Sequence, residues 1–135
     1  MVTHLLLPPL DPRVVEGLAH LPDDVIAVEP VPGPDGSLGP RICAAIRLLD
    51  PPAPLVIVAF GPGALHLPAV ALAQRSAHKR VVGYLLIEPE LPKVADVWPD
   101  APVCVVSSDD WTSTQVRLRG WEQLESLSDW QPPVA

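Results

Sequence analysis

The side chains best suited to acid–base chemistry in this chain are those of Glu88, Asp109, Asp110 and His66. Each one follows an apolar run of the kind that forms a buried strand. Carboxylates that meet at one edge of a sheet raise one another's pKa and can exchange protons with a substrate. The alternative is structural: the carboxylates cap the following turns or helices, and the ring of His66 bonds to backbone near a helix start. If the protein is an enzyme, these four residues are its catalytic candidates.

A glycine turn, Gly61-Pro62-Gly63, separates the apolar run of residues 55–60 from a segment rich in alanine and leucine. A strand, a tight turn and a helix in this order are typical of the central strand of a parallel sheet, where phosphate loops and nucleophiles are often found. The turn lacks the Gly-Lys-Ser/Thr sequence of a Walker phosphate loop. A dinucleotide site is disfavoured by Pro62, by the missing third glycine and by the absence of an acidic residue about 20 positions later.

The histidines and cysteines give no pattern typical of a metal site. His4, His20, His66 and His78 are dispersed, and no two of them share the H-x-x-x-H spacing of a helical metal site. Cys43 and Cys104 fall in a predicted helix and a predicted strand, where a free cysteine packs as a small apolar residue. The sequence therefore predicts neither a metal nor a cofactor.

The length and charge of the chain exclude several classes of protein. It has 135 residues, enough for one domain spanning 1–135, and 48% of them are hydrophobic. Its net charge of −7 opposes binding to nucleic acid, because such binding depends on clustered Lys and Arg. No apolar run approaches the roughly 18 residues of a membrane span, and residues 1–7 lack the basic start of a signal peptide. We expect a cytoplasmic protein that binds neither nucleic acid nor a membrane.

The apolar runs and the helix-start signals alternate along the chain. The predicted strands cover residues 3–7, 25–29, 55–60, 81–88, 102–107 and 121–127. The predicted helices cover residues 12–20, 40–49, 93–98 and a segment that ends at 119, whose N-cap is Thr112 or Ser113. A further helix follows Gly63, and it is either kinked at Pro68 or starts late, with Pro68 in its first turn.

This alternation predicts an α/β protein with a three-layer α/β/α sandwich. The expected sheet is mainly parallel, with five to six strands in the order 2-1-3-4-5-6. Ligands bind such sheets beyond the carboxyl ends of the strands, here at the switch point between strands one and three. Trp98, Trp111 and Trp130 are expected in loops near that edge. The candidate ligand-binding residues are Pro8, Leu10, Gly61, Pro62, Gly63, His66 and Trp130.

The order of elements over about residues 3–131 resembles the core of the α/β-hydrolase superfamily without the first two strands and the lid of that family. Residues 102–110 look like the acid-bearing strand and loop of that family. Residues 119–130 look like the segment that normally ends in the catalytic histidine. The turn at residues 59–63 corresponds to the G-x-S-x-G nucleophile elbow.

The chain departs from the family pattern at the positions that carry hydrolysis. Gly61 occupies the position of the nucleophile, and Trp130 stands at the position of the histidine. The oxyanion loop contains Pro8 and a second proline, neither of which has an N–H to donate. Only the acid remains, as Asp109 or Asp110. The resemblance therefore implies an α/β-hydrolase-like protein that has lost acyl-transfer chemistry.

Three hypotheses of function follow. The preferred one is a non-hydrolytic protein that binds a partner protein or a small metabolite, as a homodimer or with a protein partner, because residues 91–98 leave apolar surface uncovered. The alternative is a non-hydrolytic enzyme of a biosynthetic pathway (an isomerase, epimerase, cyclase or decarboxylase) that uses Asp109, Asp110, Glu88 or His66. The third is a residual hydrolase with Ser107, Ser108 or Cys104 as nucleophile.

Overall fold

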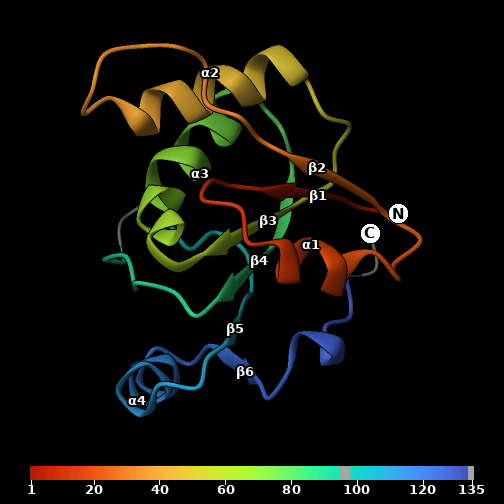
Figure 1. Ribbon diagram of the computed structural model, residues 1–135, viewed down its shortest axis with the longest axis vertical. Coiled ribbons are helices and arrows are strands. Elements are labelled where there is room, and N and C mark those ends of the chain that lie inside the picture. Colours follow the sequence, from red (N-terminus) through yellow and green to blue (C-terminus); the bar gives the residue numbers. More distant parts are fainter. Residues whose placement is uncertain (95–97, 134–135) are drawn as a thin grey trace.

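Six parallel strands form one sheet across the protein, seen in a computed structural model that describes residues 1–94 and 98–133. The order across the sheet is β2-β1-β3-β4-β5-β6, as Figure 1 shows, and it confirms the predicted order. Every pair of neighbouring strands is parallel. The strands are β1 (Thr3–Leu6), β2 (Asp24–Ala27), β3 (Leu55–Phe60), β4 (Val81–Ile87), β5 (Val103–Val106) and β6 (Glu122–Leu124).

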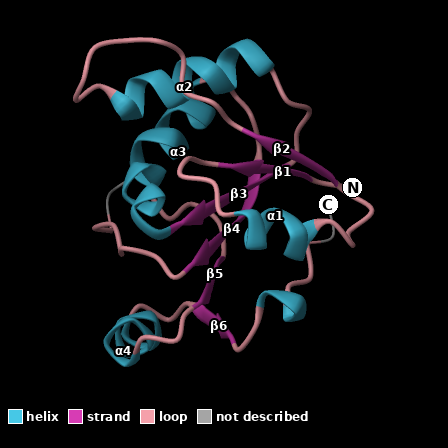
Figure 2. Ribbon diagram, viewed as in Figure 1, coloured by secondary structure: helices cyan, strands magenta, loops and turns pink. Residues whose placement is uncertain are grey.

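Helices cover both faces of the sheet, which confirms the three-layer architecture (Figure 2). One face packs against α2 (Leu38–Leu49), α3 (Leu67–Ser76) and α4 (Asp110–Leu118). The other packs against α1 (Pro12–Leu18) and the short 3₁₀ helix η2 (Leu127–Asp129). We call these the α2–α3 face and the α1 face.

The central strand β3 has the bounds that the sequence predicts, because it is buried on both faces. Leu55, Ile57 and Ala59 pack towards the α2–α3 face, whereas Val56 and Val58 pack towards α1. A strand covered on both sides has no solvent-facing positions, so its sequence is a continuous apolar run.

The helix after β3 starts late, as one of the two sequence alternatives expects. Residues Gly61–His66 first form a 3₁₀ helix, η1, and α3 follows with Pro68 in its first turn. There the missing N–H of proline has no hydrogen bond to lose. The start of α4 was predicted wrongly: its N-cap is Asp109, not Thr112 or Ser113.

Residues 89–99 connect β4 to the loop before β5. The predicted helix 93–98 lies partly outside the described residues, since 95–97 are not described. Trp98 is fully buried and packs edge-on against Tyr84 and Trp121, with ring centroids 5.7 and 5.3 Å away. Its expected place in a loop at the carboxyl edge is therefore wrong. In the part of the chain that the structure describes, no helix is long and apolar enough to cross a membrane.

Candidate functional site

A hollow of about 230 Å³ opens on the α1 face, where the carboxyl ends of β3 and β4 meet the start of α1. Its floor is apolar and its rim carries two carboxylates and one guanidinium. The residues that line it are Asp11, Arg13, Val14, Phe60, Ile87, Glu88 and Leu127. Ligands of parallel sheets bind at this kind of position, beyond the carboxyl ends of central strands.

The rim on the α1 side is an ion pair that the helix start holds in place. Asp11 is the N-cap of α1, and one of its carboxylate oxygens accepts a hydrogen bond of 2.8 Å from the backbone N–H of Arg13. The guanidinium of Arg13 folds back and donates to the same carboxylate at 2.9 and 3.2 Å. These hydrogen bonds, first from the side chain and then from the backbone of Arg13, lower the pKa of Asp11. The guanidinium, on a side chain that is 84% exposed, lies at the mouth of the hollow.

The rim on the opposite side is Glu88, the residue that follows β4. Its backbone has a left-handed φ of +44°, which is costly for a residue with a Cβ. The N–H of Glu88 donates to the carbonyl of Val106 at 2.7 Å, and its carboxylate accepts from the N–H of Ser108 at 3.0 Å. These bonds tie the end of β4 to the loop after β5, so they hold the carboxylate at the hollow despite the strained backbone.

The structure does not gather the four catalytic candidates at one place. Asp109 caps α4, since its carboxylate accepts from the N–H and the hydroxyl of Thr112, each at 2.8 Å. These bonds, the backbone one first, lower the pKa of Asp109, and they confirm the capping alternative. Asp110 lies exposed in the first turn of α4. His66 ends η1 beside Gly39 of α2, on the opposite face from the hollow. Of the four, Glu88 alone lines the hollow.

The switch-point crevice above the glycine turn is almost filled. A Cβ on Gly63 would lie 2.6 Å from the carbonyl oxygen of Pro8, so the loop after β1 rests directly on the turn. Beside it, the space around Leu10 and Phe60 is only about 10 Å³, close to the volume of one water probe. Pro62 is exposed on the outer side of the turn. None of the predicted ligand-binding residues lines the hollow.

Trp130 does not lie at the carboxyl edge, which corrects the expectation from the sequence. It is buried in the core of the α1 face, and its indole N–H donates to Nε2 of His4 at 3.1 Å. After β6 the chain turns through η2 and passes back under the sheet, where His4 offers the one acceptor that a buried indole needs. Trp111 was also expected in a loop, but it lies in the first turn of α4, and of the three tryptophans it alone is exposed.

Sequence reasoning missed six of the seven residues that line the hollow: Asp11, Arg13, Val14, Phe60, Ile87 and Leu127. A signal was present, because Asp11 followed by proline indicates a helix start. In a parallel sheet, the helix after strand one begins at the carboxyl edge. That start therefore belongs beside the switch point, with its first charged residues.

The proposed nucleophiles are not activated. Burial, followed by the charge of Glu122, raises the pKa of Cys104 to about 12, so its thiol stays protonated at neutral pH. The hydroxyl of Ser107 accepts from the N–H of Asp109 at 3.1 Å. No histidine pairs with Ser107, Ser108 or Cys104 among the described residues. In the described ranges, no group of three or more His, Cys, Asp or Glu side chains is placed so that it could hold a metal ion.

Comparison of the chain with protein-family models, with curated proteins and with solved structures finds no match.

Proposed function

We propose that this chain is a non-hydrolytic, α/β-hydrolase-like protein that binds a small metabolite in the hollow between α1 and the ends of β3 and β4. One observation carries the non-hydrolytic part of the proposal. Gly61, at the end of the central strand, has a φ of +56°, and a Cβ there would meet no atom within 4 Å. This is the backbone that presents a nucleophile in an elbow, and here it carries no side chain.

The charges on the rim favour one kind of metabolite. Asp11 and Glu88 supply two carboxylates against the single guanidinium of Arg13, which is already paired with Asp11. Glu88 has no cation within salt-bridge distance among the described residues. A ligand that carries an amine would pair with Glu88 while its apolar part covers Phe60 and Leu127.

The non-hydrolytic part is tested with an activity-based probe. A fluorophosphonate should not label the protein, and p-nitrophenyl butyrate should not be turned over. Gly61→Ser should also stay inactive, because among the described residues no imidazole lies within 4 Å of the position of its Cβ to take the proton. Labelling of a serine in the native protein would contradict the proposal.

The binding part is tested by NMR titration with small aliphatic and amino-acid amines. We expect shifts confined to residues of the hollow, and about 10-fold weaker binding in Glu88→Gln, because a charge-assisted hydrogen bond is lost. Glu125→Gln is the matched control, since Glu125 is exposed and lies outside the hollow. Equal affinity in the two variants would exclude Glu88 as the binding group.

A second candidate function is favoured by the backbone of Glu88. A left-handed non-glycine residue that holds a carboxylate over a hollow is typical of a residue kept for function. Glu88 would then act as the base of an isomerase or epimerase: its carboxylate takes a proton from the carbon next to a carbonyl, the electron pair passes to the carbonyl oxygen as an enolate, and the proton is returned to carbon. Incubation of an amino ketone in D₂O should give deuterium at that carbon, and Glu88→Gln should abolish its incorporation.

Self-association is a separate proposal. Three large apolar side chains are strongly exposed: Leu48 is 78%, Trp111 65% and Leu118 76% exposed. Pairing of such residues between two copies would remove apolar surface from water. Size-exclusion chromatography with light scattering should show a dimer, and a monomer at all concentrations would contradict it.

A further inference from the structure

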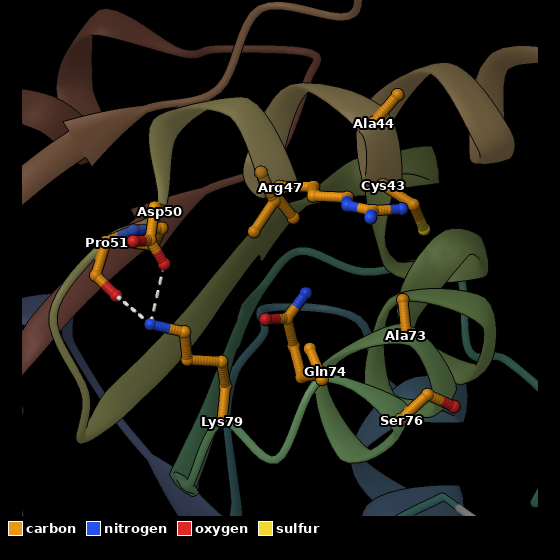
Figure 3. A pocket seen from close by; sticks show the side chains of 11 residues that line it. Cys43, Ala44, Arg47, Asp50, Pro51, Ala73, Gln74, Ser76 and Lys79 are labelled. Atoms are coloured by element: carbon orange, nitrogen blue, oxygen red, sulfur yellow. Dashed lines mark hydrogen bonds and ion pairs between the residues drawn. The ribbon is translucent and has the colours of Figure 1, made fainter.

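A second and larger cavity lies away from the hollow, on the α2–α3 face. It is a groove of about 520 Å³ between the C-terminal halves of α2 and α3, near the amino ends of the strands (Figure 3). We call it the α2–α3 groove. Its volume is within the range of sites that hold small organic molecules. Its lining residues are Cys43, Ala44, Ile46, Arg47, Asp50, Pro51, Ala73, Gln74, Ser76, Ala77 and Lys79.

The first unusual feature of the groove is Gln74. The residue is only 4% exposed, yet Figure 3 shows its amide pointing into the space between the two helices. Its side chain makes no hydrogen bond with any residue that the structure describes. Neither amide atom is among the buried side-chain atoms that lack a partner, which are His4 Nδ1 and Trp98 Nε1 among the described residues, so the amide is accessible from the groove. The amide of Gln74 therefore offers an N–H donor to a ligand.

The second feature is an unbalanced positive charge. The chain has a net charge of −7, but the charged residues that line the groove are two cations, Arg47 and Lys79, and one carboxylate, Asp50. That carboxylate is occupied, since Lys79 Nζ lies 2.7 Å from Asp50 and 3.5 Å from the carbonyl of Pro51.

Arg47 is an exposed cation at the rim of the groove. Figure 3 shows its guanidinium extending along the groove towards Cys43. Within the described ranges, 1–94 and 98–133, it has no carboxylate partner. A guanidinium and an amide N–H on the same groove are the donors that a carboxylate accepts from.

The walls define the rest of the ligand. Apart from the charged rim they are short and apolar: the alanines at 44, 73 and 77, with Ile46 and Pro51. Burial raises the pKa of the Cys43 thiol, so that this side chain also remains neutral. A single free guanidinium balances one negative charge, and small apolar walls leave room for an aliphatic chain.

We propose that the α2–α3 groove binds a monoanionic aliphatic carboxylate. Its head group lies between Arg47 and the amide of Gln74, and its chain lies along the alanine walls. The groove and the hollow are on opposite faces of the sheet, so this inference does not depend on the function proposed above.

The test is an NMR titration of the full chain with octanoate. We expect saturable shifts of the side-chain NH₂ of Gln74 and of the backbone around Cys43 and Ala73. Octanol, which lacks the charge, should bind at least about 10-fold more weakly. Arg47→Met and Gln74→Leu should each weaken octanoate binding by about 10-fold or more. Arg117→Met is the matched control and should bind like the wild type, since Arg117 is exposed on α4.

Unchanged dispersion of the amide spectrum shows that each variant is folded. The proposal is overturned if octanoate does not bind, if Arg47→Met and Gln74→Leu both keep full affinity, or if the shifts map to the hollow around Glu88. Octyl phosphate binding about 10-fold more tightly than octanoate would overturn the assignment to carboxylates.

Discussion

At the scale of single residues, Gly61 and Gly63 are two glycines of one turn with different physical roles. Gly61 has a positive φ and open space where a Cβ would lie, so its replacement costs only conformational energy. A Cβ on Gly63 would lie 2.6 Å from the carbonyl oxygen of Pro8, and backbone cannot move aside as a flexible side chain can. We expect Gly61→Ala to lower the free energy of unfolding by about 1 kcal/mol and Gly63→Ala by about 3 kcal/mol.

Urea unfolding of the two variants measures this difference directly. Both carry the same substitution in the same turn, so each is the control for the other. A larger loss in Gly61→Ala than in Gly63→Ala would contradict the contact between Pro8 and the turn.

At the scale of elements, α4 shows why an acidic residue after a strand is ambiguous. The carboxylate of Asp109 satisfies the N–H of Thr112 at the helix start, where backbone donors have no partner within the helix. We expect Asp109→Ala to lower the melting temperature, and Asp109→Ser to retain most of it, because serine is also a good N-cap. Circular dichroism melts measure both.

Asp110→Ala is the control, because Asp110 lies in the same turn and does not cap the helix. If Asp109→Ser lost any binding or turnover found for the protein while keeping its stability, Asp109 would have a role beyond the cap.

The elements differ in how far the sequence determines them. Burial on both faces makes β3 a continuous apolar run, so its bounds were predictable. Pro68 narrowed the start of α3 to two alternatives, a kinked helix or a late start, and the structure has the late start. The start of α4 was not, because Asp109, Thr112 and Ser113 are all good caps.

The candidate site was predicted less well than the fold. The position of Trp130 depends on a turn of the chain after β6, which has only three residues and no clear buried face. The donors of the groove, Arg47 and Gln74, lie on two helices, and only the packing of these helices brings them to one cavity.

At the scale of the whole molecule, one buried hydrogen bond joins the two ends of the chain. His4 on β1 and Trp130 after η2 are 126 positions apart, and both are buried on the α1 face of the sheet. Nε2 of His4 accepts the indole N–H, so this nitrogen must be unprotonated in the folded state. The bond therefore holds the C-terminal segment to the first strand only while His4 is neutral.

This arrangement predicts a loss of stability in weak acid. Burial lowers the pKa of His4, against the charge of Asp23 and the backbone of Asp24, which raise it. The unfolded chain takes up a proton near the ordinary value of 6.5, whereas the folded chain does not until a lower pH. Stability is therefore complete above about pH 6.5 and falls as the pH drops, by up to about 1.4 kcal/mol per unit, until the folded pKa is reached. Urea unfolding between pH 7.5 and 5 measures this slope. His4→Phe should remove most of this slope. His20→Gln, at an exposed position, is the control and should keep the slope. An equal slope in the wild type and in His4→Phe would show that another group titrates.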